Sequence, residues 1–206
     1  MPEEEQETGR VGAKRVQRLL EATTRFNLPY DAYQHKERVT LKMITGHVET
    51  YDLNGDHLDG DGQALTRVYV ESKNLKGAGG QSAEFRRFLA QAYSATKAVM
   101  EDTGTDPKYE FMWATTCPWI GDGFRDVATE DALRVAITTE AVRDENVLIG
   151  GKRVPKVVPD GHDIEEVVLR AVTGRIWVWV ISDRHEQMSI SRKVRGWISQ
   201  MREEAA

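Results

Sequence analysis

The chain has 206 residues, of which 40% are hydrophobic and 30% charged, an ordinary composition for a globular protein. Its formal net charge of −5 at pH 7 argues mildly against a protein that coats nucleic acid nonspecifically. No stretch approaches the roughly 18 apolar residues of a membrane span, and the acidic start MPEEEQETGR is unlike a signal or transit peptide. The single cysteine, Cys117, excludes an internal disulfide and a cysteine-based zinc site, so these features together predict a cytoplasmic protein.

The first half of the chain has the pattern of a helix, three strands and a second helix. After a lead-in over 1–9, which we expect to be disordered, 11–26 has the apolar spacing of an amphipathic helix. Its predicted inner stripe is Val16, Leu19, Leu20 and Thr23. The strands predicted next are 37–46, 47–55 and 67–74. A polar loop rich in Gly and Asp, 55–66, separates the last two strands. The long segment 82–102 has the apolar periodicity of a buried helix face.

The second half continues to alternate between strands and helices. The elements predicted there are a buried strand over 109–119, a helix over 129–142, a loop region over 145–163, a helix over 163–175, a strand over 176–183 and a closing amphipathic helix over 191–204. This alternation predicts the α/β class, with a central mixed β-sheet flanked by helices. We expect one domain over 10–206, with a motif-bearing core over about 10–119 and a C-terminal α/β elaboration over about 120–206.

The strand segment VYVESKN carries charged residues that can do chemistry. The period of two in a strand directs Glu71 and Lys73 to one side and Ser72 to the other. If this strand pairs with the preceding one as an antiparallel hairpin, Asp52 and Glu71 converge at one end of the sheet. Two carboxylates and the backbone carbonyl of Ser72 make an all-oxygen site suited to Mg²⁺ or Mn²⁺. Lys73 then stands beside the ion, where it can orient the attacking water.

The chain carries the pattern Asp52, then a variable loop, then Glu71-Ser72-Lys73. This pattern resembles the active-site signature of the PD-(D/E)xK nuclease superfamily, which includes restriction endonucleases and archaeal Holliday-junction resolvases. The order of the flanking elements is similar as well, with a helix before the hairpin and a long helix and buried strand after it. The resemblance covers about half of the chain. It implies a restriction-endonuclease-like core in which Asp52 and Glu71 are metal ligands and Lys73 is the catalytic lysine.

The resemblance extends to the two helices, with departures. Several branches of the superfamily carry a glutamine in the helix after the lysine, for which Gln91 in LAQAYSA is the best match and Gln81 the second. Many members place a glutamate on the first helix as an extra ligand. Glu21 and Gln17 are the candidates here, and neither matches that pattern well. The proline that gives the signature its name is absent, because Tyr51 precedes Asp52.

The function that this resemblance implies is metal-dependent hydrolysis of nucleic acid, with DNA as the expected substrate, by an endonuclease of restriction, phage-defence or recombination type. In such hydrolysis the metal ion stabilises developing charge and lowers the pKa of the attacking water. The partners expected are nucleic acid, a second copy of the chain or a larger defence complex, and no membrane. Two alternatives stay open: a non-catalytic nuclease-like module that binds nucleic acid or a protein partner, and an α/β protein in which ESK is a surface strand.

The acidic stretch DLNGDHLDGDG gives a competing metal-site pattern. Asp52 and Asp56 fall at the first and fifth positions of an EF-hand loop, but His57 stands where the loop needs glycine and Gln63 where it needs glutamate. An EF-hand is therefore excluded. Asp56 or Asp59 replaces Asp52 as the metal acid if the strand register differs from the predicted one.

Other charged and aromatic residues are weaker candidates. His47 can reach a site near Asp52 as an alternative ligand or base, although a surface histidine is the simpler interpretation. Trp119 follows Pro118 at a strand end and is a candidate substrate contact. Basic clusters, ordinarily solvated faces, occur at 14–18, 86–87, 152–156 and 192–195.

Overall fold

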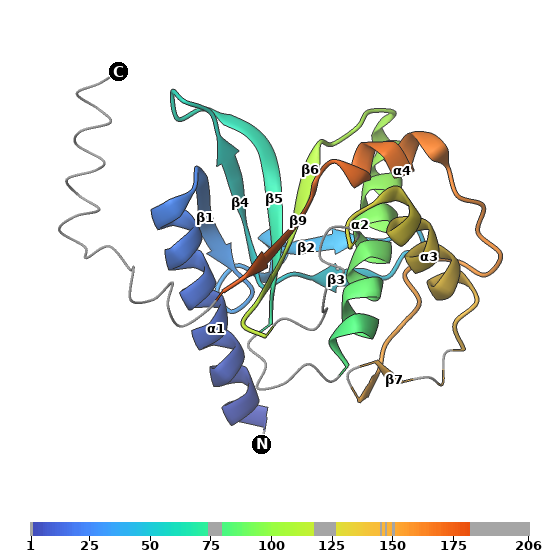
Figure 1. Ribbon diagram of the computed structural model, residues 1–206, viewed down its shortest axis with the longest axis horizontal. Coiled ribbons are helices and arrows are strands. Elements are labelled where there is room, and N and C mark those ends of the chain that lie inside the picture. Colours follow the sequence, from blue (N-terminus) through green and yellow to red (C-terminus); the bar gives the residue numbers. More distant parts are fainter. Residues whose placement is uncertain are drawn as a thin grey trace.

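A five-stranded mixed sheet forms the centre of the protein (Figure 1). The computed structural model describes residues 2–73, 80–117, 127–144, 146, 148–149 and 151–181, except for the side chains of 2–6. In the order β1-β4-β5-β6-β9, the strands are β1 (Phe26–Asp31), β4 (Leu53–Leu58), β5 (Ala64–Lys73), β6 (Tyr109–Thr115) and β9 (Ile176–Val180). β1, β4 and β5 pair antiparallel, whereas β5, β6 and β9 run parallel. The predicted α/β class with a mixed central sheet is confirmed.

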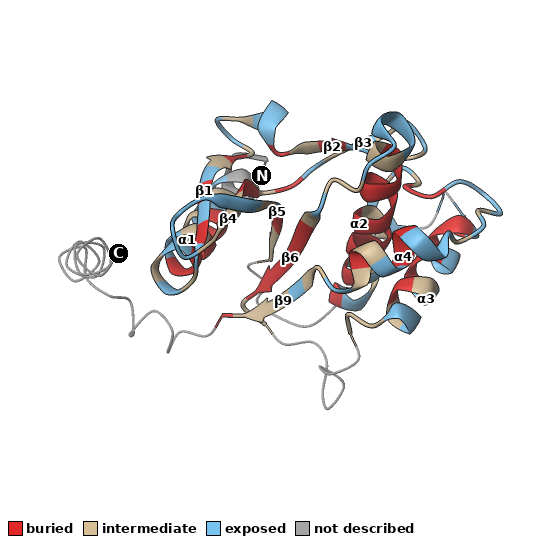
Figure 2. Ribbon diagram, turned by 90° about the horizontal axis from the view of Figure 1, so that it is seen from above, coloured by how far each residue is buried: buried red, intermediate tan, exposed pale blue. Residues whose placement is uncertain are grey.

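Helices cover both faces of this sheet (Figures 1 and 2). They are α1 (Pro2–Thr23), α2 (Gln81–Thr103), α3 (Glu130–Ala141) and α4 (Glu166–Thr173). A short 3₁₀ helix, η1, spans Lys36–Arg38. The small hairpins are β2 (Thr40–Lys42) with β3 (Val48–Thr50), and β7 (Leu148–Ile149) with β8 (Lys152–Arg153). Within the described ranges, no helix is long and apolar enough to cross a membrane.

The alternating side chains of β5 divide the core into two layers. Val68 and Val70 pack with the apolar residues of α1 on one face. Tyr69 points to the opposite face, where it joins the aromatic residues of α2. Figure 2 shows buried residues along β6 and on the inner side of α2. Glu71 and Lys73 are two and four residues after Tyr69, so their side chains point to the same face of the sheet, which α2 covers.

Helix α1 begins earlier than the sequence predicted. Its bounds are Pro2–Thr23, so the segment 2–9, expected to be disordered, is helical. Val16 and Leu19 of the predicted inner stripe are buried, whereas Thr23 is exposed and donates its hydroxyl hydrogen to the Leu19 carbonyl. Glutamate and glutamine are good helix formers, so a helix nucleated by its packed apolar stripe extends into the acidic start.

The strands around the candidate acid differ from those predicted. β1 forms where the sequence predicted the end of the first helix, and Pro29 is tolerated because β1 is an edge strand. The predicted strand 47–55 is divided at Tyr51 and Asp52 into β3 and β4. β4 then runs to Leu58, through residues predicted as loop. These residues have low strand propensity, and their extended conformation comes from pairing on both sides.

A bulge in β1 accounts for the glycine in β4. The register of β1 against β4 shifts just after Asn27. A Cβ on Gly55 would lie 1.9 Å from the Asn27 carbonyl oxygen and 2.6 Å from the Leu28 Cα. Gln17 donates to the Leu28 carbonyl at 2.7 Å, and Glu21 accepts from the Leu28 N–H at 3.0 Å. The α1 side chains therefore hold the bulged strand, and only glycine fits opposite it.

We expect Gly55→Ala to lower the free energy of unfolding by about 1–3 kcal/mol, because the added methyl group forces paired strands apart. Urea unfolding followed by circular dichroism measures the change. Gly174→Ala is the control, since a Cβ there meets nothing within 4 Å. Equal unfolding midpoints for the two variants would contradict the close approach of β1 to β4.

Candidate active site

Asp52 lies where β1, β4 and β5 meet. Its backbone N–H donates to the Val70 carbonyl and its carbonyl accepts from the Ala32 N–H, each at 3.0 Å. Its side-chain Oδ2 accepts a hydrogen bond from the Ser72 N–H at 2.7 Å. The antiparallel register of β4 against β5 therefore brings Asp52 beside Glu71. The convergence of these two acids, expected for a hairpin, is present in the fold.

Tyr51, the residue before Asp52, anchors the backbone beside this acid. Its ring is buried, with ring centres 5.4 Å from Tyr69, 5.9 Å from Phe111 and 6.5 Å from Phe88. Its backbone N–H donates to the Val39 carbonyl at 2.9 Å. Because this large side chain is packed against three other aromatic rings, its burial fixes the backbone next to Asp52.

Among the described residues, no positive charge fully compensates the carboxyl group of Asp52. Burial is the main cause that raises its pKa from the usual 3.8 to about 7, and the negative charge of Glu71 raises the pKa further. The Ser72 N–H and the Lys73 ammonium lower the pKa without cancelling these effects. A nearby cation would therefore stabilise the ionised form of Asp52.

Lys73 is held by two carboxylates. Its Nζ lies 2.9 Å from Oε1 of Glu71 and 3.1 Å from Oε2 of Glu84. It also lies 5.3 Å from the centre of the Trp113 ring, within cation–π range. Burial alone would lower the pKa of Lys73, but the charges of Glu71 and Glu84 outweigh it and raise the pKa above its usual range. Lys73 is therefore a fixed, charged hydrogen-bond donor at neutral pH.

Glu84 is the residue at this site that sequence reasoning missed. It lies in the first turn of α2, after the left-handed cap residue Gly80 with φ of 82°. Negative charge is favoured in the first turn of a helix. The signal that could have identified it is topological: a helix that follows one strand and leads to a parallel neighbour begins near the end of the first strand. The first turn of α2 was therefore a place to look for side chains beside Lys73.

The two candidate glutamines of α2 lie in different surroundings. Gln81 is buried, accepts from the Thr115 hydroxyl at 3.0 Å and donates to the Cys117 carbonyl at 3.0 Å. It joins the start of α2 to the end of β6. Gln91 is seven residues beyond Glu84, roughly 10 Å further along the helix axis. None of the hydrogen bonds in the described part of the chain joins Gln91 to the acidic site.

The alternative acids have structural contacts of their own. Asp56 pairs with an arginine of β5 at 3.6 Å. Asp59 accepts from the N–H groups of Asp61 and Gln63, as a turn former does. Glu21 and Gln17 of α1 bind the β1 backbone, as described above, and neither extends the acidic site. Asp52 is therefore the upstream acid that the geometry favours.

Several predicted features fall elsewhere. The His47 ring nitrogen Nε2 lies 3.5 Å from Oε1 of Glu49, on the β2–β3 hairpin rather than beside Asp52. Trp119 and the predicted closing helix 191–204, with its basic cluster, lie outside the described residues.

The residues present fit a hard divalent cation. Asp52, Glu71 and Glu84 are three carboxylates around the single ammonium group of Lys73, so the cluster carries excess negative charge. Mg²⁺ commonly binds through one or two carboxylates, with waters and substrate phosphates completing its shell. Within the described ranges, no group of three or more His, Cys, Asp or Glu side chains is arranged to hold a metal ion. An ion bound by Asp52 and Glu71 would therefore take most of its ligands from water or substrate.

A scan against protein-family models, a search of curated proteins and a search of solved structures each give no match to this chain. The resemblance to PD-(D/E)xK nucleases therefore rests on Asp52, Glu71 and Lys73 and on the order of the elements that carry them.

The raised pKa of Asp52 predicts a pH dependence of stability. In the folded protein Asp52 keeps a proton that the unfolded chain releases between about pH 4 and pH 7, so stability falls as pH rises through this window. Without metal, Asp52→Asn should exceed the wild type in stability at about pH 8, by on the order of 2 kcal/mol after solvent screening, and match it near pH 4. Urea unfolding in EDTA across this range measures the difference. A less stable variant at pH 8 would mean that the carboxylate is already compensated.

The two glutamines of α2 provide a matched pair. Gln81→Ala removes two hydrogen bonds from a buried position and should lower the free energy of unfolding by about 1–3 kcal/mol. Gln91→Ala should change it by less than about 0.5 kcal/mol. Thermal unfolding of both variants shows which substitution destabilises the protein more. A larger effect of Gln91→Ala would contradict the structural role assigned to Gln81.

Proposed function

We propose that this protein is a metal-dependent nuclease that hydrolyses phosphodiester bonds, with DNA as its substrate. The observation that carries the proposal is the meeting of Asp52, Glu71 and Lys73 at one end of the β4–β5 hairpin, with the carboxyl group of Asp52 uncompensated. Asp52 and Glu71 would hold Mg²⁺ or Mn²⁺, with the Ser72 carbonyl as a further oxygen donor. When bound, the ion stabilises negative charge on the phosphate and promotes ionisation of the attacking water.

Lys73 orients the attacking water and offsets charge on the phosphate. Its ammonium group keeps its proton at neutral pH, because Glu71 and Glu84 raise its pKa. It therefore acts as a donor rather than as a base. A charge that is already in position when the substrate arrives stabilises a developing negative charge without reorganisation.

Glu84 acts as a positioning residue for Lys73. The carboxylate of Glu71 serves both the metal ion and Lys73, so on its own it leaves the lysine free to move when the ion binds. Glu84, at 3.1 Å from the Lys73 Nζ, supplies a second anchor from a different element. The lysine is thereby located by both the strand and the helix.

Restriction, phage defence and recombination are the settings proposed for this activity. Two copies of the chain would present one site to each strand of a duplex, and a larger defence complex would recruit the site to its target. We assign no role for Gln91 in the chemistry, because its position on α2 is two turns beyond Glu84.

A second candidate is a nuclease-like module that binds nucleic acid without cutting it. The observation that favours it is the pairing of Glu71 with Lys73 at 2.9 Å, which commits the second metal acid to an ion pair. If that pair is stronger than the attraction of Glu71 for a metal ion, the site stays closed to the ion.

Cleavage assays distinguish the two candidates. Supercoiled, linear and single-stranded DNA are incubated with Mg²⁺, Mn²⁺ or EDTA. We expect cleavage only with metal, and a rate at least about 100-fold lower in Lys73→Ala, as for the loss of one preorganised hydrogen-bond donor to developing negative charge. The matched control is Lys42→Ala, at an exposed lysine of β2 whose Nζ lies 3.9 Å from Oδ2 of Asp102.

The results of these assays distinguish a catalytic role of Lys73 from the alternatives. Metal-dependent cleavage at equal rates in Lys73→Ala and Lys42→Ala would remove Lys73 from the mechanism. DNA binding without cleavage in the wild type would favour the second candidate. Thermal unfolding with Mg²⁺ gives an independent readout, because an ion held by Asp52 raises the midpoint of the wild type but not of Asp52→Asn.

A further inference from the structure

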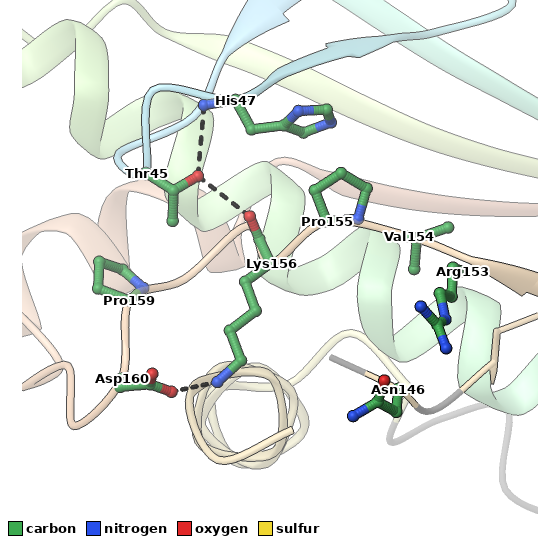
Figure 3. A pocket seen from close by; sticks show the side chains of 9 residues that line it. All are labelled: Thr45, His47, Asn146, Arg153, Val154, Pro155, Lys156, Pro159 and Asp160. Carbon is green, nitrogen blue, oxygen red and sulfur yellow. Dashed lines mark hydrogen bonds and ion pairs between the residues drawn. The ribbon is translucent and has the colours of Figure 1, made fainter. Parts of the chain in front are cut away.

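A cavity of about 700 Å³ lies outside the acidic site, on the side of α2 where α3 packs (Figure 3). Its walls come from the turn between β2 and β3, from Asn146 and from the segment 153–160. Figure 3 shows Arg153 and Asn146 on one side of the cavity and Lys156 with Asp160 on the other. Ligand pockets in proteins commonly enclose roughly 300–1,000 Å³, so this volume suits a small organic ligand.

The cavity offers one uncommitted positive charge. Lys156 is paired with Asp160, and the His47 ring lies 3.5 Å from the Glu49 carboxylate. Arg153 makes no ion pair or hydrogen bond with any side chain in the described part of the chain, and it is exposed at the cavity edge. A guanidinium group presents paired N–H donors that match the oxygens of a phosphate. In a chain with net charge −5, this is a local site for an anion.

Apolar and amide groups line the same space. Val154, Pro155 and Pro159 contribute apolar surfaces, and prolines present no backbone N–H to be left unpaired. The Asn146 side chain donates one amide hydrogen to Oδ1 of Asp144 at 3.0 Å, which leaves one donor hydrogen and the acceptor oxygen near Arg153 (Figure 3). A planar heterocycle with polar edges fits such a combination better than a simple inorganic anion does.

The wall of the cavity is held in place by buried arginines. Arg87 donates to the Pro155 carbonyl at 2.7 Å and pairs with Glu140 at 3.2 Å. Arg143 donates to the Val154 carbonyl at 3.0 Å. Thr45 donates to the Lys156 carbonyl at 3.1 Å from the opposite side. The backbone of this wall is therefore fixed before any ligand arrives, which reduces the entropy lost on binding.

We propose that this cavity binds a nucleotide, with the phosphate on Arg153 and the base between the apolar wall and the amide of Asn146. The nucleotide is either free or part of a single strand, since both present the same phosphate and base. The site is separate from the acidic cluster, although Arg87 lies one turn after Glu84 on α2. Binding here requires neither a metal ion nor cleavage.

The test measures binding by isothermal titration calorimetry to the full chain in EDTA. The probes are adenosine 5′-monophosphate, adenosine, inorganic phosphate and a single-stranded deoxythymidine decamer. We expect the mononucleotide or the decamer to bind more tightly than adenosine or phosphate alone. Arg153→Ala should weaken that binding at least about tenfold, as for the loss of one charge-assisted hydrogen bond. Lys152→Ala is the control, because Lys152 lies beside Arg153 on the same exposed strand, carries the same charge and does not line the cavity.

Each outcome decides the proposal. Selective weakening in Arg153→Ala supports it, and the tighter of the mononucleotide and the decamer identifies the source of the nucleotide. Equal weakening in Arg153→Ala and Lys152→Ala would falsify it, because only general electrostatics would then be at work. Inorganic phosphate binding as tightly as the nucleotides, or no binding at millimolar concentration, would also overturn it. Failure of cleavage by the wild type leaves these measurements unchanged, since they are made without metal.

Discussion

The pairing of β5 with an antiparallel strand on one side and a parallel strand on the other is the constraint on which the candidate site depends. The antiparallel partner, β4, starts beside the end of β5 and brings Asp52 to Glu71. The parallel partner, β6, requires a crossover helix, and the first turn of that helix returns to the same end with Glu84. Without the antiparallel pair, Asp52 would not lie beside Glu71. Without the parallel pair, Lys73 would keep only one carboxylate partner, Glu71.

The fold class and the acidic pair were predictable because both follow from short-range patterns. Alternation along β5 separates Val70 from Glu71, and that separation determines which residues enter the core and which reach α2. The bounds of β1 and β4 were not predictable in the same way. Pro29 and Gly55 disfavour strands in isolation, and they are tolerated only because an edge and a bulge coincide there. Tertiary pairing overrides local propensity at such positions.

The residues on α2 show a different limit of sequence reasoning. A glutamine is easy to find in a helix, but its position along the axis relative to a strand end depends on the length of the connection. Gln81 lies at the strand ends and is committed to the Thr115 hydroxyl, whereas Gln91 lies two turns beyond Glu84. Local sequence context favoured Gln91, whereas the fold places Gln81 nearer the strand ends, because topology sets the position of a helix residue relative to a strand.

Charge balance connects the two candidate functions of the acidic site. The carboxylate of Glu71 is shared between Lys73 and the space beside Asp52, so a divalent ion and the lysine compete for it. An ion that binds both acids weakens the hold of Glu71 on the lysine. Glu84 then keeps the ammonium group in place, since its contact with Nζ does not involve the metal acids. A cation–π contact with Trp113 acts in the same direction. If an ion binds, Glu84 and Trp113 would therefore keep the lysine in place, as the proposed catalytic role requires.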